Sequence, residues 1–133
     1  MSEEEAPRGA SRSVSSYLLD ILDAISRIER YTDGVTEGQF LADLEKQDAV
    51  SRRLQVIGEA ARHIPRGLRA EQPRIPWSSI VGMRNILSHA YHDEDPVLLW
   101  RTVQRRLSPL KQAAQQLLQR VDHPHDRAPD PGS

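Results

Sequence analysis

The chain has 133 residues, which is enough for one domain with a modest core and too few for two. It contains no cysteine, which excludes disulfides and thiolate metal sites, and its net charge is only −1. The acidic first residues lack the apolar stretch of a signal peptide, and no apolar run approaches the ~18 residues that span a bilayer, so we expect a soluble, cytoplasmic protein without a membrane partner.

The charge is unevenly distributed along the chain. Residues 1–50 carry 5 basic and 11 acidic side chains, residues 51–92 carry 7 and 2, and residues 93–133 carry 6 of each. The basic middle segment could form an electropositive surface for an anionic partner such as RNA. Its arginines could instead be ordinary solvated side chains on helix surfaces, and charge alone favours this second interpretation.

Two terminal segments, residues 1–12 and 122–133, are rich in charge, proline and small polar residues. Such segments bury too little apolar surface to fold, so we expect two disordered tails around one domain over residues 13–121. Within that domain, no segment alternates with the period of two that is typical of a half-buried strand. The sequence therefore predicts an all-α fold.

Helical spacing appears directly after the first tail. Apolar residues at steps of 4, 3, 4 and 3 predict a helix over residues 13–32, which ends at the turn signal Asp33-Gly34. Thr36 and Gln39 match a capping box, which predicts that a short helix follows.

A second long helix is predicted from about Val50 to Ile64, where the same apolar steps recur until Pro65 ends them. The prolines and the glycine of residues 65–76 predict a connector with one helical turn. Residues 76–91 are expected to be helical again, with the proline accepted at the first position.

Asp95 is predicted to cap the last helix, which starts at Pro96. Pro109 lies inside this helix, where a proline removes one hydrogen bond and clashes with the preceding turn, so we expect a kink near Leu107. Four main amphipathic helices joined by short links, with further short helices between them, predict an up-down bundle.

The segment RNILSHAY at residues 84–91 places an arginine, a histidine and a tyrosine close together. At about 100° per residue, Arg84 and Tyr91 project from nearly the same side of a regular helix, whereas His89 lies about 140° from Arg84. The three side chains meet only if the helix ends near His89 or if a second copy of the chain completes the site. Gly82, which costs about 1 kcal/mol relative to alanine in mid-helix, suggests a close approach by another helix or by substrate.

Arginine and histidine together suit phosphodiester chemistry. An imidazole with a pKa of about 6.5 exchanges a proton at neutral pH, and a guanidinium offers forked donors to the charge that develops on a phosphoryl group. In RNA, a base that deprotonates the ribose 2′-hydroxyl lets this oxygen attack the adjacent phosphate without a metal ion. Such an Arg-His pair also occurs by chance in many helical proteins, so the residues alone leave His89 open as a surface or capping histidine.

The same segment resembles a known ribonuclease signature. It is similar to the Arg-x4-His-x-Tyr motif of HEPN ribonucleases, and the longer runs IPWSSIVGMRNILSHAYHDED and QDAVSRRLQVIGEAARHIP resemble the HepT-like toxin family. The resemblance extends over residues 14–121. It implies an all-α homodimer in which two copies of the motif meet in a cleft and cut RNA (mRNA or tRNA), not DNA, without a metal or another cofactor.

Carried over residue by residue, the resemblance places Arg84 and His89 at the catalytic positions and Asn85 and Tyr91 at supporting positions. It also implies that an MntA-like nucleotidyltransferase antitoxin silences this toxin by transferring AMP from ATP to Tyr91. The added bulk and phosphate charge would then occupy the place where an RNA phosphate docks.

The chain departs from this family pattern at two positions. Many relatives have a glycine between the histidine and the tyrosine and an aromatic residue after the tyrosine, where this chain has Ala90 and His92. His92 adds a second titratable ring beside the expected site.

Arg52, Arg53 and Arg101 are the candidate RNA-binding residues outside the motif, although arginines on the last helix could instead pair with acidic side chains across the surface. His63, at the end of its helix two residues before Pro65, is interpreted as a cation at the C-terminal dipole of that helix. The alternative to a ribonuclease is a non-catalytic helical subunit that holds a nucleotide for a nucleotidyltransferase, because the same residue types can bind a phosphate without cleaving it.

Overall fold

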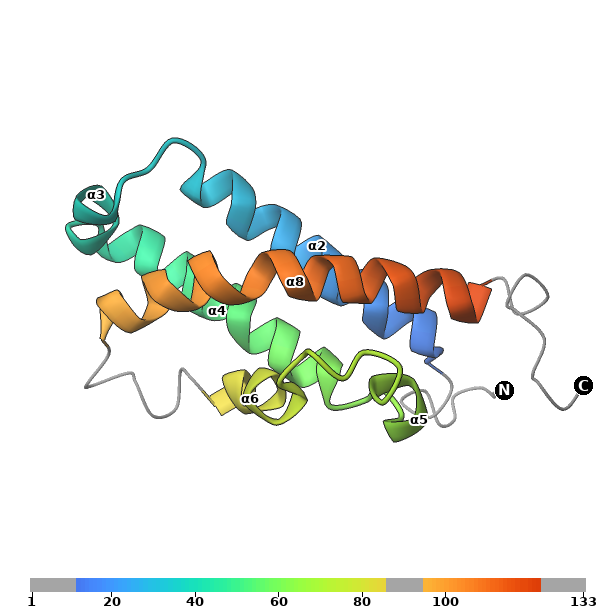
Figure 1. Cartoon of the computed structure of the whole chain (residues 1–133). Coiled ribbons are helices and arrows are strands. Elements are labelled where there is room, and N and C mark those ends of the chain that lie inside the picture. The colour runs from blue at the N-terminus through green and yellow to red at the C-terminus, as the bar shows by residue number, and fades with distance from the viewer. Residues whose placement is uncertain (1–11, 86–94, 123–133) are drawn as a thin grey trace, which may run out of the picture.

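The computed structural model of the chain describes residues 12–85 and 95–122, and every regular element within these two ranges is a helix (Figure 1). The predicted all-α fold is confirmed. The long helices are α2 (Val14–Thr32), α4 (Leu44–Ala61) and α8 (Pro96–Asp122). The short elements are α3 (Glu37–Leu41), α5 (Arg66–Arg69), α6 (Trp77–Gly82) and the 3-10 helix η1 (Met83–Asn85). None of the helices in the described ranges is both long and apolar enough to cross a membrane.

The predicted tails lie outside the described residues except at their inner ends. Arg12 forms an ion pair with Asp20 at 3.0 Å, and Asp122 is the last residue of α8. The boundaries of the domain stay a prediction.

Side-chain caps fix where the helices begin. The Ser13 hydroxyl accepts a hydrogen bond from the Ser16 amide at 3.1 Å before α2, and Thr36 forms the predicted capping box with Gln39 before α3. The predicted cap of the last helix is also confirmed, because the Asp95 carboxylate accepts bonds of 3.0 and 3.3 Å from the amides that follow it. Each cap satisfies backbone donors that the first turn of a helix leaves free.

Helix α2 runs antiparallel to α4, and α8 runs in the same direction as α4, because the short segment α6–η1 leads the chain back between them (Figure 1). Figure 1 shows α2 and α4 as antiparallel neighbours joined through α3, with α8 packed along α2 and crossing in front of α4. The turn after α2 uses Gly34 at φ 71°, a left-handed conformation that glycine adopts without strain. Helix α8 continues across Pro109 as one element, as expected, whereas the kink near Leu107 stays a prediction.

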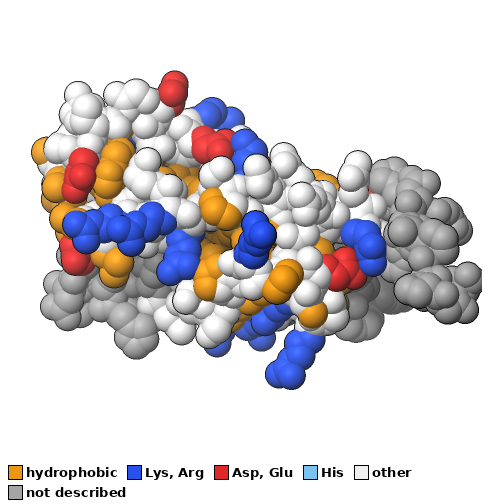
Figure 2. Space-filling model, in the orientation of Figure 1, with side chains coloured by type: hydrophobic (Ala, Val, Ile, Leu, Met, Phe, Trp, Pro, Cys, Tyr) orange, Lys and Arg blue, Asp and Glu red, His pale blue; other side chains and the backbone are white. Residues whose placement is uncertain are grey.

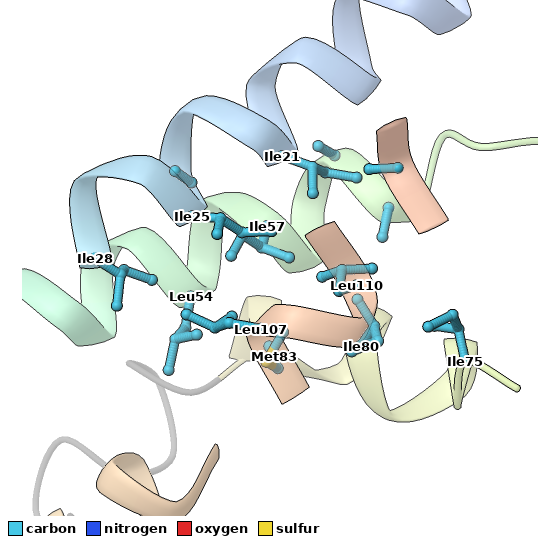
Figure 3. Packing of buried hydrophobic residues seen from close by; sticks show 14 of the residues in the cluster. Ile21, Ile25, Ile28, Leu54, Ile57, Ile75, Ile80, Met83, Leu107 and Leu110 are labelled. Carbon is cyan, nitrogen blue, oxygen red and sulfur yellow. The ribbon is translucent and has the colours of Figure 1, made fainter. Parts of the chain in front are cut away.

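One hydrophobic core joins the long helices and the short segment α6–η1 (Figure 3). Fully burying a large aliphatic side chain contributes roughly 1.5–3 kcal/mol, so these residues dominate the stability of the bundle. The labelled members from the long helices are Ile21, Ile25, Ile28, Leu54, Ile57, Leu107 and Leu110. Ile80 of α6 and Met83 of η1 are buried in the same core, which anchors the residues on either side of them.

The segment predicted as a helix over residues 76–91 is not one regular α-helix. The α-helix ends at Gly82 and tightens into η1, which reaches Asn85, and residues 86–91 lie outside the described part of the chain. A 3-10 stretch at the end of an α-helix is common because its hydrogen bonds, which join residues three apart instead of four, satisfy carbonyls that the last turn leaves free. The angles of a regular α-helix therefore do not place Arg84 relative to the residues that follow it.

The connector between α4 and α6 is tied at both ends by side chains. Arg69 donates to three backbone oxygens at the C-terminal end of α4, the nearest being that of Ile64 at 2.9 Å. Trp77 Nε1 donates to the backbone oxygens of Arg69 and Gln72, both at 3.1 Å. The predicted single helical turn in this connector is α5.

Candidate active site

Arg84 lies in η1, whose backbone is pressed against α4 at Gly58. A Cβ atom added to Gly58 would lie 2.3 Å from the backbone nitrogen of Arg84 and 2.9 Å from the carbonyl carbon of Met83. These separations are far below van der Waals contact, so only a residue without a side chain lets η1 approach α4 this closely. Gly58 therefore sets how closely the backbone of Arg84 approaches α4.

Of the two explanations that the sequence offered for Gly82, the close approach of another helix is not found in the described part of the chain, whereas approach by substrate stays a prediction. A Cβ atom added there would meet nothing within 4 Å. Both glycines lie in helices and give the same sequence signal, but only Gly58 faces the backbone of another element.

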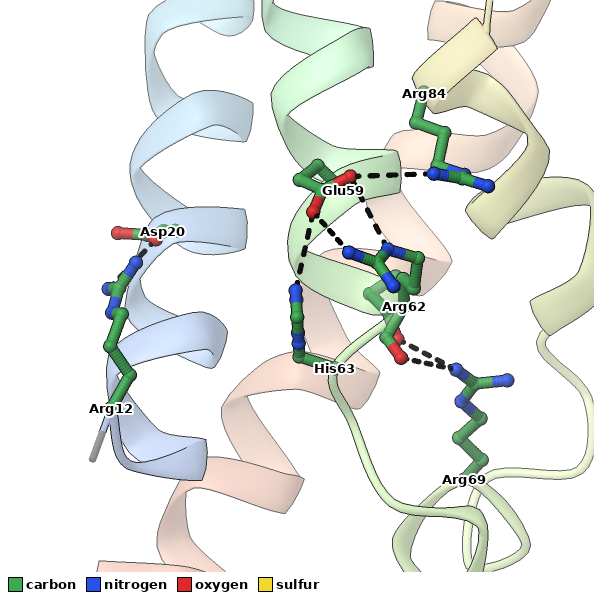
Figure 4. A network of polar contacts seen from close by, with 8 residues as sticks. Arg12, Asp20, Glu59, Arg62, His63, Arg69 and Arg84 are labelled. Carbon is green, nitrogen blue, oxygen red and sulfur yellow. Dashed lines mark hydrogen bonds and ion pairs between the residues drawn. The ribbon is translucent and has the colours of Figure 1, made fainter. Parts of the chain in front are cut away.

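Glu59 follows Gly58 on α4 and contacts three cationic or titratable side chains (Figure 4). Its carboxylate accepts hydrogen bonds from Arg62 at 3.0 and 3.5 Å, and it lies 3.3 Å from His63 Nε2 and 3.8 Å from Arg84 Nη1. The spacings i, i+3 and i, i+4 place Arg62 and His63 beside Glu59 on one face of the helix. Glu59 thus connects α4 to the arginine of η1.

The electrostatics of this cluster follow from its contacts. The hydrogen bond from Arg62 lowers the pKa of Glu59, burial opposes this effect, and the bond with His63 lowers the pKa further. The same carboxylate raises the pKa of Arg62. The contact with Arg84 is weak, because the arginine side chain is 42% exposed and 3.8 Å is long for an ion pair. A phosphate with good geometry can therefore replace Glu59 at Arg84.

The cluster faces a surface hollow of about 630 Å³ between α2, α4 and η1. Three arginines and two carboxylates line it, which leaves a modest excess of positive charge, and these residues are Arg12, Arg52, Arg84, Asp20 and Glu59. Tyr17 and His63 add an aromatic wall. The hollow thus offers both cations and ring faces to a ligand.

The residues predicted from the sequence have different positions relative to this hollow. Arg84, Asn85 and Arg52 line it, and the structure brings them together from α4 and η1. Arg53 is on α4 but does not contribute to the lining. His89 and Tyr91 lie outside the described residues, so their roles stay predictions.

Arg101 lies on α8 and is also outside the lining of the hollow. The face of the molecule seen in Figure 2 shows Lys and Arg side chains that are separate from one another, with Asp and Glu side chains among them. Lys111 pairs with Glu29 at 3.2 Å, and Arg120 pairs with Glu71 at 3.0 Å. Contact of Arg101 with RNA stays a prediction.

Sequence reasoning missed Glu59 and Tyr17 and gave His63 a role only at a helix end. A signal for Glu59 was present, because its spacing to Arg62 and His63 predicts mutual contact on one helix face. No such signal existed for Tyr17, which comes from a different helix.

The chemistry available in the described residues is that of anion binding. The Arg84 guanidinium can donate two parallel hydrogen bonds to a phosphate. Residues 12–85 and 95–122 contain no group of three or more His, Cys, Asp or Glu side chains that could hold a metal ion. An exposed arginine in a mixed charged and aromatic hollow suits the phosphate of a nucleotide or of a nucleic acid.

Comparison with known proteins identifies the family. Residues 21–117 match the HepT-like family, described as ribonuclease HepT-like. The chain belongs to the HepT-like ribonuclease family. The resemblance seen in the sequence is confirmed, and so is the prediction of an enzyme of the ribonuclease class.

Individual relatives of this HepT-like ribonuclease agree with the family match. The protein named "Probable ribonuclease HepT" from Thermococcus cleftensis is 42% identical over 100 residues, which cover 75% of this chain and 91% of the relative. "Putative RNase MJ1380" from Methanocaldococcus jannaschii is 35% identical over 102 residues, which cover 77% and 94%. "Putative RNase TTE0752" from Caldanaerobacter subterraneus is 29% identical over 104 residues, which cover 78% and 93%. No solved structure matches the chain significantly.

Proposed function

We propose that this HepT-like ribonuclease is the toxin of a toxin–antitoxin system and a metal-independent RNA endonuclease. Arg84 binds the phosphate at the cleaved bond, His89 exchanges the proton, and Asn85 supports the arginine. The observation that supports this proposal is the position of Arg84, which is 42% exposed at a hollow and held by a long 3.8 Å contact with Glu59. A guanidinium held in this way is positioned yet free to accept a new anion.

In the proposed reaction, His89 takes the proton of a ribose 2′-hydroxyl, and the 2′-oxygen attacks the adjacent phosphorus. The bond from phosphorus to the 5′-oxygen breaks, and a proton passes to this leaving oxygen. The products are a 2′,3′-cyclic phosphate and a 5′-hydroxyl. Arg84 stabilises the negative charge that develops on the non-bridging phosphate oxygens.

The proposal includes a homodimer in which the Arg84–Tyr91 segments of two chains meet. It also includes control by an MntA-like nucleotidyltransferase antitoxin. In that step the Tyr91 oxygen attacks the α-phosphorus of ATP, pyrophosphate leaves, and AMP remains on the tyrosine. The negative phosphate of this AMP group repels the RNA backbone from Arg84, which silences the toxin.

An RNA-cleavage assay tests this function. Arg84→Ala and His89→Ala should each lower the cleavage rate of the unmodified protein at least about 100-fold, because each removes a group that acts in the transition state. Arg27→Ala is the matched control, since Arg27 is exposed on α2, forms a 3.0 Å pair with Asp23 and does not line the hollow. Circular dichroism shows whether the variants stay folded.

Two results would contradict the proposal. A folded His89→Ala variant that cuts RNA at the wild-type rate would remove the catalytic assignment. A wild-type protein that binds a nucleotide but cuts no cellular RNA would favour the alternative of a non-catalytic subunit.

Mass spectrometry tests the proposed control by the antitoxin. After co-expression with the nucleotidyltransferase, the protein should carry AMP on Tyr91 and should no longer cut RNA.

A further inference from the structure

Tyr17 of α2 and His63 at the end of α4 form a stack in the wall of the hollow. Their ring centroids are 4.4 Å apart, and the ring planes differ by 11°. The Arg12 guanidinium lies over the Tyr17 ring at 4.5 Å from its centroid. Two groups this close to the centre of one ring must occupy its opposite faces, so Tyr17 lies between Arg12 and His63.

The stack is connected to the phosphate-binding arginine through one carboxylate. Glu59 lies 3.3 Å from His63 and 3.8 Å from Arg84, so both contact the same side chain (Figure 4). The aromatic wall and the arginine are therefore close enough for a base and a nearby phosphate of one nucleic-acid strand to contact both.

Arg12 covers the outer face of Tyr17 only weakly. Its side chain is 41% exposed, and the ion pair that holds it, with Asp20 at 3.0 Å, is equally exposed. Exposed pairs of this kind contribute about 0–1 kcal/mol, so a ligand can displace Arg12 at little cost. The face of the tyrosine is thus accessible to a flat group that stacks better than the guanidinium does.

We propose that Tyr17, stacked on His63, is a nucleobase-binding subsite for single-stranded RNA beside Arg84. The base takes the ring face that Arg12 covers, and the guanidinium moves to the outer face of the base. This inference rests on the proposed function and names the form of RNA that the site accepts.

The preference for a single strand follows from the chemistry of stacking. In a duplex, both faces of each base are already covered by neighbouring bases, whereas an unpaired base has a free face for an aromatic side chain. Arg52 and Arg84 line the same hollow and supply cations for the phosphates of the RNA backbone. Stacking requires no particular base, so the subsite selects unpaired RNA and not a sequence.

The test measures binding of a fluorescent single-stranded 10-mer of 2′-O-methyl RNA, which lacks the free 2′-hydroxyl and stays uncut. Tyr17→Leu should weaken binding about tenfold, as loss of one base–aromatic stack does. Tyr17→Phe keeps the ring and should bind like wild type. Tyr31→Leu is the matched control, because Tyr31 is a half-buried tyrosine of the same helix that does not line the hollow.

A second probe needs no protein variant and covers the case in which Tyr17→Leu does not fold. The same 10-mer without bases should bind wild type about tenfold more weakly than the intact strand, and a duplex of the same sequence should also bind more weakly. Equal affinity of wild type for the strands with and without bases would overturn the subsite. A duplex that binds as tightly as the single strand would overturn the preference.

Cleavage of unmodified RNA by wild type separates this inference from the proposed function. If wild type cuts RNA but folded Tyr17→Leu keeps full affinity, the subsite is wrong and the ribonuclease assignment stands. If wild type binds the strand in a Tyr17-dependent way but cuts nothing, the subsite stands and the catalytic proposal is wrong. If wild type neither binds nor cuts RNA, both are wrong.

Discussion

Glu59 is the residue whose charge organises the described part of the site. Its pKa is lowered in the folded protein, chiefly by the hydrogen bond from Arg62. A carboxyl group with a lowered folded-state pKa stabilises the protein above its unfolded pKa, and this stabilisation is lost as the pH falls through the lowered value. The contribution of Glu59 is therefore present at neutral pH and disappears in acid.

Replacing Glu59 by Gln tests this effect. The amide keeps the shape of the side chain without the charge, so Tm should fall by about 2 °C at pH 7, a small change because Glu59 is half exposed. The difference between the two proteins should close below the ordinary glutamate pKa of about 4.3. Calorimetry of both proteins from pH 7 to acid measures this difference in Tm. A difference that stays constant with pH would show that the charge of Glu59 does not contribute to stability.

The sequence predicted some residues of the site and not others for a simple reason. Arg84 and Asn85 belong to a short motif, and Arg52 lies in the basic middle segment, so local information was enough. Tyr17 and His63 meet only because of the register between α2 and α4, which no spacing within one helix reveals.

At the scale of elements, the contact between η1 and α4 sets the position of Arg84. The periodicity of residues 76–91 predicted a helix but not its change to a 3-10 turn at Met83. Apolar spacing does not separate these two helix types over three residues. The close approach at Gly58 was not predicted either, because it depends on how η1 packs against α4 and not on spacing within one helix.

Gly58→Ala and Gly82→Ala form a matched pair that tests this contact. The new methyl group at Gly58 meets backbone atoms that cannot rotate away, so stability should fall by about 1–3 kcal/mol. Displacement of Arg84 should also lower cleavage by up to about 100-fold. Gly82→Ala meets nothing within 4 Å, and it should raise stability by about 0.5–1 kcal/mol and leave cleavage intact.

Thermal unfolding and the RNA-cleavage assay measure both variants. If Gly58→Ala matched wild type in both measurements, η1 would be free to move away from α4, and the contact would not position Arg84.

At the scale of the whole molecule, the up-down arrangement followed from the apolar stripes and short links of the sequence. The stripe residues Ile21, Ile25, Leu54 and Ile57 are all buried, because a helix with one apolar face must pack it against another helix. Assembly with a second chain is a different matter. A stripe shows which face is apolar and does not show which molecule covers it.

A dimer of two different mutants tests the proposed assembly. Arg84→Ala and His89→Ala chains with different tags can be purified as a mixed dimer, in which each chain lacks one group. If each site combines Arg84 of one chain with His89 of the other, one of two sites is intact, and about half of the wild-type rate should return. An inactive mixed dimer would show that each chain supplies both groups to its own site.

The tied connector between α4 and α6 loses its conformational entropy when the chain folds, before any ligand binds at the active site. A free loop of this kind would keep many backbone conformations, and fixing each residue costs about 1–2 kcal/mol of conformational entropy. Arg69 and Trp77 hold the connector through five hydrogen bonds to backbone oxygens. Because folding has already removed this freedom, ordering of the connector does not reduce the binding free energy of a ligand at Arg84.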